Sequence, residues 1–211
     1  MPWPDKHKGK TRSRILGAAA AAFRSRGISN VGVAEVMRTA GLTHGGFYAH
    51  FASKDDLLAE ALKLAMEQVE AHLTRAMHNA PAEDRLLAAA SSYLSPQHLA
   101  HPEQGCPVAA LGPELVRGNK RLRQILAEGI TRRLGKIRDL ISPTLPPEVR
   151  REQAAGVLAC MLGGLILARS LDKRHGVELL NDCLAFLREA LDCLRPHVAS
   201  QTGDSSAIRS G

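Results

Sequence analysis

The sequence ISNVGVAEVMRTAGLTHGGFYAHFASKDDLL, residues 28–58, decides the fold. Its first half places apolar residues three and four positions apart, as on one face of a helix, and Gly41 follows them directly. Glycine after a helix accepts a left-handed backbone at low cost, so we expect the first helix to stop there. Thr43 then offers an N-cap hydroxyl for a second helix over 44–50. Two short helices joined by a tight turn that contains glycine predict a helix-turn-helix unit.

The second helix of this unit exposes small or hydrogen-bonding side chains and no negative charge. Phe47 and Phe51 lie four residues apart and are expected on its inner side. Gly45 and Gly46 each cost the helix about 1 kcal/mol relative to alanine, a cost that fits a backbone that must come close to a DNA groove. On the residues alone, a solvent-facing turn of a small helical protein explains the spacing equally well. The exposed candidates are Thr43, His44, Gly45, Gly46, Tyr48 and His50.

The run from Gly27 to Leu57 resembles the N-terminal domain of the TetR-type transcriptional regulators. The pattern AGL-T-x-G-x-x-Y-x-H-F-x-S-K-x-x-L over residues 40–57 is highly specific, and residues 11–58 resemble the family closely. The resemblance implies that Tyr48 and Lys54 contact phosphates, and it assigns the other exposed positions to bases or adjacent backbone. The predicted DNA-binding set is Arg12, Val33, Thr43, His44, Gly45, Gly46, Phe47, Tyr48, His50 and Lys54. The chain departs from the family at Val31 and Gly32, where Thr or Ser is frequent, and at His44, where Lys is frequent.

The charge of the chain is concentrated at its N-terminal end. Residues 1–54 contain nine Lys or Arg and two acidic residues, whereas the other 157 residues contain nineteen of each. Neutralisation of phosphates supplies most non-specific affinity for DNA, so a polyanionic partner explains this asymmetry. A generic solvated basic face is the alternative.

The composition predicts an all-α protein. Aromatic residues make up only 3%, Ala and Leu are abundant, and the hydrophobic and charged shares of 45% and 23% are ordinary for a globular chain. No run of about 18 uncharged apolar residues is present, and the best candidate, 154–168, is short, so we expect no membrane span. The first ten residues lack the apolar region of a secretion signal, which favours a cytoplasmic location. The four cysteines show no metal-ligand spacing. We therefore expect no metal and no cofactor.

The chain as a whole predicts about nine helices in two domains. Residues 1–54 form the DNA-binding domain, 55–198 a regulatory and dimerisation domain, and 199–211 a disordered tail. Residues 1–10 are expected to be a disordered basic arm, with Thr11 capping the first helix and Arg12 and Arg14 in its first turn. Helices are expected at 12–26, 33–40, 44–50, 53–77, 83–94, 108–116, 119–140, 147–171 and 177–194, with a loop at 95–107.

The last two helices, at about 147–171 and 177–194, predict a homodimer. The first of them carries small residues four apart, which allow another helix to approach closely. The second carries a stripe of leucines at 180, 184, 187, 191 and 194. A helix pair that is apolar on more than one side needs a partner to bury it, and a symmetric four-helix interface supplies one. Two copies of the short helix, roughly 34 Å apart, would read a palindromic operator on double-stranded DNA. The alternative is that the subunit core consumes both faces.

The resemblance further implies a repressor that a small molecule releases from DNA. The C-terminal half is rich in Leu, Ala, Val and Ile, so its pocket suits a largely apolar effector. Cys106 stands before Pro107, a residue favoured at the first position of a helix. A helix N-terminus favours the thiolate, so Cys106 is a candidate sensor of electrophiles or oxidants. A small residue that merely fills a helix start is the plainer interpretation, and Cys160, Cys183 and Cys193 are expected in the core.

Two other functions fit parts of the sequence. A ligand-independent architectural DNA-binding protein explains the basic head but not the large, nearly neutral remainder of the chain. A thiol enzyme that uses Cys106 with His98 or His101 lacks an orienting Asn or Asp and leaves the basic segment unexplained. We therefore expect a regulator and not an enzyme.

Overall fold

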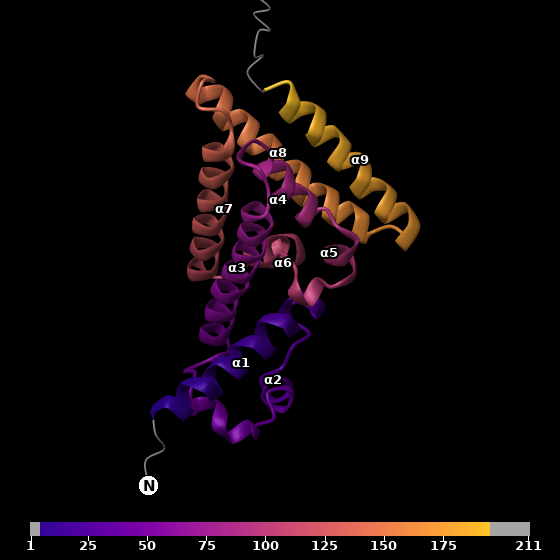
Figure 1. The fold of residues 1–211 in the computed structure, drawn as a ribbon. Helices are drawn as coiled ribbons and strands as arrows, with labels where there is room; N and C mark the ends of the chain where they lie inside the picture. The colour runs from indigo at the N-terminus through magenta and orange to yellow at the C-terminus, as the bar shows by residue number, and fades with distance from the viewer. Residues whose placement is uncertain (1–4, 195–211) are drawn as a thin grey trace, which may run out of the picture.

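The computed structural model describes residues 5–194, and these residues form nine α-helices and three short 3-10 helices, without strands. The all-α prediction is confirmed. Figure 1 shows α1 and α2 at one end, α3 leading from that end into the body, and α8 and α9 side by side at the other. The elements are α1 (Asp5–Arg26), α2 (Val33–Thr39), η1 (His44–Ala49), α3 (Lys54–His78), η2 (Ala82–Asp84), α4 (Arg85–Tyr93), α5 (Pro96–Ala100), η3 (Pro102–Gln104), α6 (Pro107–Val116), α7 (Lys120–Leu140), α8 (Pro147–Arg169) and α9 (Lys173–Asp192).

The first helix is longer than predicted. It begins at Asp5, so the disorder predicted for residues 1–10 is wrong for 5–10, and residues 1–4 lie outside the described part. Thr11 is consequently an interior residue and not the N-cap. Arg12 and Arg14 lie beyond the first turn, where the sequence had placed them. Lysine is a good helix former, and no residue between 5 and 10 breaks a helix strongly enough to stop it.

The prediction of a loop at 95–107 is wrong, because most of this segment is helical. It contains α5 and η3, each with a proline in its first turn, where the missing N–H costs nothing. Ser95 caps α5, because its Oγ accepts a hydrogen bond from the His98 N–H at 3.2 Å. The prolines that suggested a loop therefore begin short helices.

Two hydrophobic cores lie along α3. The first joins α1, α2 and η1 to the N-terminal half of α3, and also includes Leu111, Leu115 and Leu122 from α6 and α7. The second contains Tyr93, Leu165 and residues of α9. We call α1, α2 and η1 the head, and the elements from α3 to α9 the body. The predicted boundary at residue 54 coincides with the start of α3, but the first core extends across it. The predicted tail at 199–211 lies outside the described residues.

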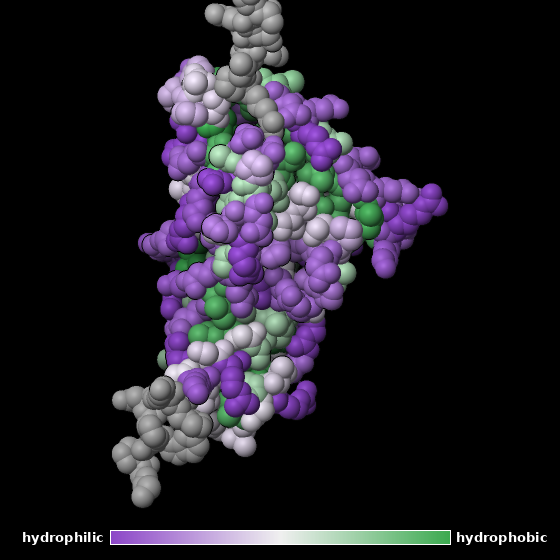
Figure 2. Space-filling model, in the orientation of Figure 1, coloured by the Kyte–Doolittle hydropathy of each residue, from purple (hydrophilic) through white to green (hydrophobic). Residues whose placement is uncertain are grey.

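Helices α8 and α9 expose apolar residues, but not those of the predicted leucine stripe. Leu180 and Leu187 are fully buried inside the subunit, whereas Phe186 is 63% exposed. On α8, Ile166 and Leu167 are exposed together with small residues such as Ala159. Figure 2 shows hydrophobic residues at the surface over this helix pair, between polar rims.

Helix α8 is long and apolar enough to cross a membrane by length and composition alone, unlike the shorter run considered from sequence. A core helix of a folded domain has the same properties, and part of α8 is buried in the body core. One further expectation is wrong: Cys193 is exposed, while Cys160 and Cys183 are half-buried between α8 and α9.

Candidate nucleic-acid interface

The turn between α2 and η1 has the predicted geometry. Gly41 adopts φ 67°, a left-handed conformation that favours glycine, and its N–H donates to the Arg38 carbonyl at 2.9 Å. The Leu42 N–H donates to the Met37 carbonyl at 2.9 Å, and Leu42 packs against the first core. The backbone bonds that end α2 therefore fix the direction in which the chain enters η1.

The second helix of the unit is a 3-10 helix and not the predicted α-helix. It spans His44–Ala49, and Thr43 occupies the N-cap position without a hydrogen bond from its hydroxyl. The Gly46 N–H instead donates to the Thr43 carbonyl at 3.2 Å. Two adjacent glycines lower the helix propensity of this segment, which accounts for a short, tighter helix. The Thr43 hydroxyl consequently stays exposed.

The aromatic residues of η1 divide between the core and the surface. Phe47 is 1% exposed and stacks on Phe51 with ring centroids 5.8 Å apart, so its side chain supports the helix from below. Direct contact of the Phe47 ring with DNA is excluded by this burial. Tyr48 is 71% exposed and meets the edge of Phe47 at 5.2 Å. The neighbouring Thr43, His44 and Gly45 are exposed as well, so these four residues share one open surface.

Arg12 and His50 lie at the edge of this surface. The Arg12 guanidinium lies 4.7 Å above the Phe51 ring and forms an ion pair with Glu60 of α3. His50 is half-buried, and its Nδ1 has no hydrogen-bond partner among the described residues. Burial, reinforced by the positive charges of Lys8 and Arg12, lowers the pKa of His50. A neutral imidazole near pH 7 can donate or accept a hydrogen bond, but it does not add positive charge.

Val33 and Lys54, which the sequence placed among the DNA contacts, are only half-exposed. Val33 is half-buried and packs against the first core. Lys54 is also half-buried, and its Nζ donates to the Ile28 carbonyl at 3.0 Å, which ties α3 to the segment before α2. A lysine ammonium has three donors, so this bond leaves two for another acceptor.

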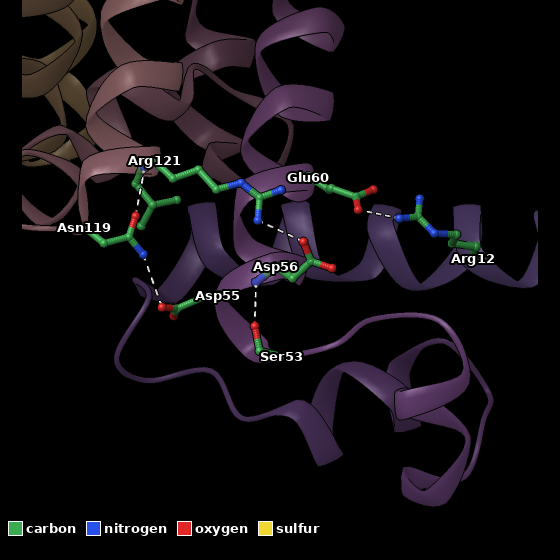
Figure 3. A network of polar contacts seen from close by, with 8 residues as sticks. Arg12, Ser53, Asp55, Asp56, Glu60, Asn119 and Arg121 are labelled. Carbon is green, nitrogen blue, oxygen red and sulfur yellow. Dashed lines mark hydrogen bonds and ion pairs between the residues drawn. The ribbon is translucent and has the colours of Figure 1, made fainter.

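The N-terminus of α3 is fixed to the body (Figure 3). Ser53 caps the helix by accepting the Asp56 N–H at 3.1 Å. The Asp55 carboxylate accepts from Asn119 Nδ2 at 3.2 Å, and the Asp56 carboxylate accepts from Arg121 Nη1 at 2.9 Å. The bond from Arg121 lowers the pKa of Asp56. These carboxylates occupy the N-terminal end of α3, a place where the backbone amides of a helix favour anions.

Sequence reasoning missed two polar links, one buried and one half-buried, between the N-terminal helices and the rest of the chain. Arg24 of α1 is 6% exposed, and it donates to the Gly105 carbonyl at 3.0 Å and to Gln68 Oε1 at 2.8 Å. Glu114 of α6 accepts the Ile28 N–H at 2.9 Å. The only available signal was an arginine beside the apolar stripe of α1, and such an arginine is usually solvated.

Cys106 lies at the N-cap of α6, as predicted, and it is buried. Its N–H donates to His98 Nε2 at 2.9 Å, while His98 Nδ1 bonds the Tyr93 carbonyl at 2.7 Å. Burial lowers the pKa of His98 to about 4, so the imidazole is neutral and both of its nitrogens are engaged. His101 instead pairs with Glu103 at 3.0 Å. A cavity of about 20 Å³ borders Cys106 and the Tyr93 ring, whose hydroxyl has no hydrogen-bond partner among the described residues.

Comparisons with known proteins agree with this geometry. Residues 15–61 match the model of the family described as bacterial regulatory proteins, tetR family. The HTH-type transcriptional regulator TtgR of Pseudomonas putida is 35% identical over 77 residues, which are 36% of each chain. The match thus spans about a third of that relative's length.

Two solved structures have the same fold over nearly the whole chain. A TetR transcriptional regulator from Chloroflexus aurantiacus superposes with a TM-score of 0.75 and 24% identity, covering 87% of this chain and 97% of the other. The TetR-family regulator SCO4454 from Streptomyces coelicolor gives a TM-score of 0.73 and 22% identity over 87% and 89% of the two chains. The family motif and the shared fold lead to one conclusion: residues 15–61 form a domain of the tetR family of bacterial regulatory proteins, and the chain has the fold of solved TetR-family regulators.

Proposed function

We propose that this protein is a transcriptional regulator that binds double-stranded DNA through η1. The observation that supports this most directly is the open surface of Thr43, His44, Gly45 and Tyr48 above a buried Phe47–Phe51 stack. The stack holds η1 from the inside, so its outer side chains are presented without being needed for folding. These side chains and the glycine backbone fit hydrogen bonding to base edges and phosphates.

The remaining residues of the contact set have supporting roles in this proposal. Gly46 and His50 border η1, and the neutral His50 imidazole suits a hydrogen bond to a base or a sugar–phosphate oxygen. Arg12 holds the Phe51 ring and Glu60, and Lys54 reaches phosphate with the donors that Ile28 does not use. Val33 and Phe47 act by fixing the position of η1.

We further propose a homodimer through α8 and α9. Ala155, Ala159 and Ile166 of α8 are exposed and lie on one face, and Phe186 of α9 is exposed as well. Small residues allow the α8 helices of two copies to approach, and Phe186 gains burial at the edge of that contact. A two-fold arrangement of this face places two η1 helices for a palindromic operator.

Repression with release by a small molecule is the output that we propose, because a regulator needs two states that DNA and effector bind unequally. For Cys106 we propose a sensing role toward electrophiles. The observations that favour it are its place at the N-cap of α6 and the small cavity next to its side chain. Its alkylation by iodoacetamide, followed by peptide mass spectrometry with exposed Cys193 as the internal reference, tests this role. Reaction of Cys106 only after unfolding would contradict it.

The central proposal is tested by selecting bound fragments from a random duplex pool. The wild-type protein is expected to enrich a palindrome with half-sites about one helical turn apart. The double variant Thr43→Ala/Tyr48→Ala is expected to lose this enrichment while it keeps its circular dichroism spectrum and melting temperature. Binding without any preferred sequence would support the architectural alternative, and absence of binding at low salt would overturn the proposal.

A further inference from the structure

A cavity of about 570 Å³ lies where the head meets the body. One wall is α1, with Gly17 and Ala21, and the opposite wall is formed by α3, α4, α5 and η3. Val69, Leu73 and Tyr93 give it an apolar floor, and all three are buried. A volume of this size suits a drug-sized organic molecule.

The charged groups around the cavity favour an anion. Two arginines line it: Arg24 is buried, whereas Arg75 is exposed and forms no salt bridge among the described residues. Glu103 is the single acidic residue of the lining, and its carboxylate is already paired with His101 at 3.0 Å. Guanidinium groups bind carboxylates, sulfonates and phosphates strongly because they donate two parallel hydrogen bonds.

Two histidines of the lining, His98 and His72, are hydrogen-bonded within the protein. His98 has both ring nitrogens bonded within the protein, to the Tyr93 carbonyl and the Cys106 N–H. His72 Nε2 of α3 lies 2.8 Å from Ser92 Oγ of α4, in the same wall. His98 and His72 therefore form parts of the wall, and the two arginines supply its permanent positive charge.

We propose that this cavity binds a small organic anion with an apolar body, and that its occupation changes the position of α1 relative to the body. This inference rests on the proposed DNA-binding function for its biological meaning, but the binding site itself does not. It differs from the apolar interior pocket expected from composition, because α1 of the head supplies one wall and because the lining is cationic.

The contacts that cross the cavity explain how a ligand acts on α1. Arg24 donates from α1 to Gln68 of α3 and to the Gly105 carbonyl after η3, so it holds the two walls together. An anion that competes for the Arg24 guanidinium loosens this link, while its apolar body fills the space against Gly17 and Ala21. The ligand thereby favours a different spacing of the two walls, which is the differential affinity that regulation requires.

The test uses two fluorescent probes that differ in charge. The anion 8-anilinonaphthalene-1-sulfonate has the size and the apolar body required, and N-phenyl-1-naphthylamine is its neutral counterpart without the sulfonate. Each is titrated into the full chain, and the fluorescence is fitted for affinity and stoichiometry. Wild-type protein is expected to bind one anionic probe per protomer, at least about tenfold more tightly than the neutral probe.

Variants locate the site. Gly17→Leu is expected to abolish binding of both probes, because a Cβ at Gly17 meets no atom within 4 Å and the larger side chain fills the cavity. Ala21→Leu provides a second filling variant should the first fold poorly. Arg75→Gln is expected to weaken the anionic probe about tenfold and to leave the neutral probe unchanged. The matched control Arg123→Gln removes an exposed arginine of α7 outside the cavity, and Phe186→Ser removes the exposed aromatic group of α9; both are expected to bind as wild type.

Three results overturn the inference: no saturable binding to the wild type, unchanged binding in both filling variants, or equal binding by Arg75→Gln and Arg123→Gln. The link to regulation is measured by adding the anionic probe to the complex with selected duplex DNA. A shift in DNA affinity of about threefold or more that Gly17→Leu removes supports it, and an unchanged affinity contradicts it. Probe binding in a protein that does not bind DNA refutes the proposed function alone, whereas DNA binding without probe binding refutes only the cavity.

Discussion

The η1 surface and the α8–α9 face are both exposed, but they expose opposite chemistry. The first presents a phenol, a hydroxyl, an imidazole and glycine backbone around Tyr48. The second presents Leu167, Phe186 and small residues. A hydrogen-bonding surface can exchange water for the phosphates and base edges of DNA, whereas an apolar face gains by meeting another apolar face. The contrast supports the proposals that the first surface binds nucleic acid and that the second binds another copy of the chain.

A substitution that disrupts the α8–α9 face is expected to have the largest effect on DNA affinity. Ala159→Arg places a charge on the exposed small-residue face of α8, and burial of an unpaired charge opposes association. The variant is expected to be monomeric by light scattering and to bind selected duplex about a thousandfold more weakly, because the second half-site no longer adds to the first.

Ala71→Arg, the same substitution at an exposed alanine of α3, is the matched control and should remain dimeric. A dimeric Ala159→Arg variant would show that copies associate through another face, or that the apolar surface has a different partner.

The stability of the body is expected to depend on pH through His98. Burial lowers the pKa of His98 from 6.5 to about 4, so the unfolded chain binds a proton that the folded chain rejects between these values. The stabilising contribution is fully present above pH 6.5 and is lost as the pH falls toward 4, by up to about 3 kcal/mol. His98→Gln is expected to show a shallower fall in the free energy of unfolding over this range than the wild type.

Urea denaturation at several pH values measures this difference. Gln97→Ala, which changes a neighbouring side chain that does not titrate, should follow the wild-type profile. Identical slopes for the His98→Gln variant and the wild type would show that acid destabilisation arises elsewhere.

Lys54 tests whether the supports of η1 also contact DNA. Lys54→Ala removes the bond to the Ile28 carbonyl and is expected to lower the free energy of unfolding by about 1–2 kcal/mol. If Lys54 also binds phosphate, affinity falls for all duplexes and the slope of log affinity against log salt decreases by roughly one. Lys63→Ala, at an exposed position of the same helix, is the control. An unchanged affinity and salt slope would assign Lys54 a purely structural role.

Tyr48→Phe is expected to have the smallest effect, on binding alone. Its hydroxyl is part of a side chain that is 71% exposed, so the melting temperature should not change. Loss of one hydrogen bond is expected to weaken binding to every duplex by about 1 kcal/mol, or roughly fivefold. By contrast, His44→Ala should change which palindrome is preferred, and selection from a random pool distinguishes the two outcomes.

The helix-turn-helix was predictable because short-range geometry determines it. Gly41 and the spacing of Phe47 and Phe51 are sufficient for a turn and an inner face, and both are present in the structure. The 3-10 form of η1 was not predicted, since the effect of two adjacent glycines on helix type depends on how the surrounding core holds them. The start of α1 at Asp5 was missed because residues 5–10 are all polar or glycine and give no periodic apolar signal.

Long-range contacts account for the larger errors. Leu180 and Leu187 of the α9 stripe face the subunit's own core. Their spacing does not indicate whether this core or a second copy of the chain covers them. Arg24 lies beside the apolar stripe of α1, and two of its acceptors are 44 and 81 positions away in the sequence. The junction cavity depends on the same distant contacts, so local patterns could not indicate it.

The unbroken course of α3 through both cores has a mechanical consequence. Its 25 residues span about 37 Å at 1.5 Å per residue. Turning such a rod by about 5° around its far end displaces its beginning by roughly 3 Å, the length of one hydrogen bond. A small rotation of α3 that leaves the packing of the body intact would therefore move Lys54 and η1 out of register with the DNA groove that we propose they bind.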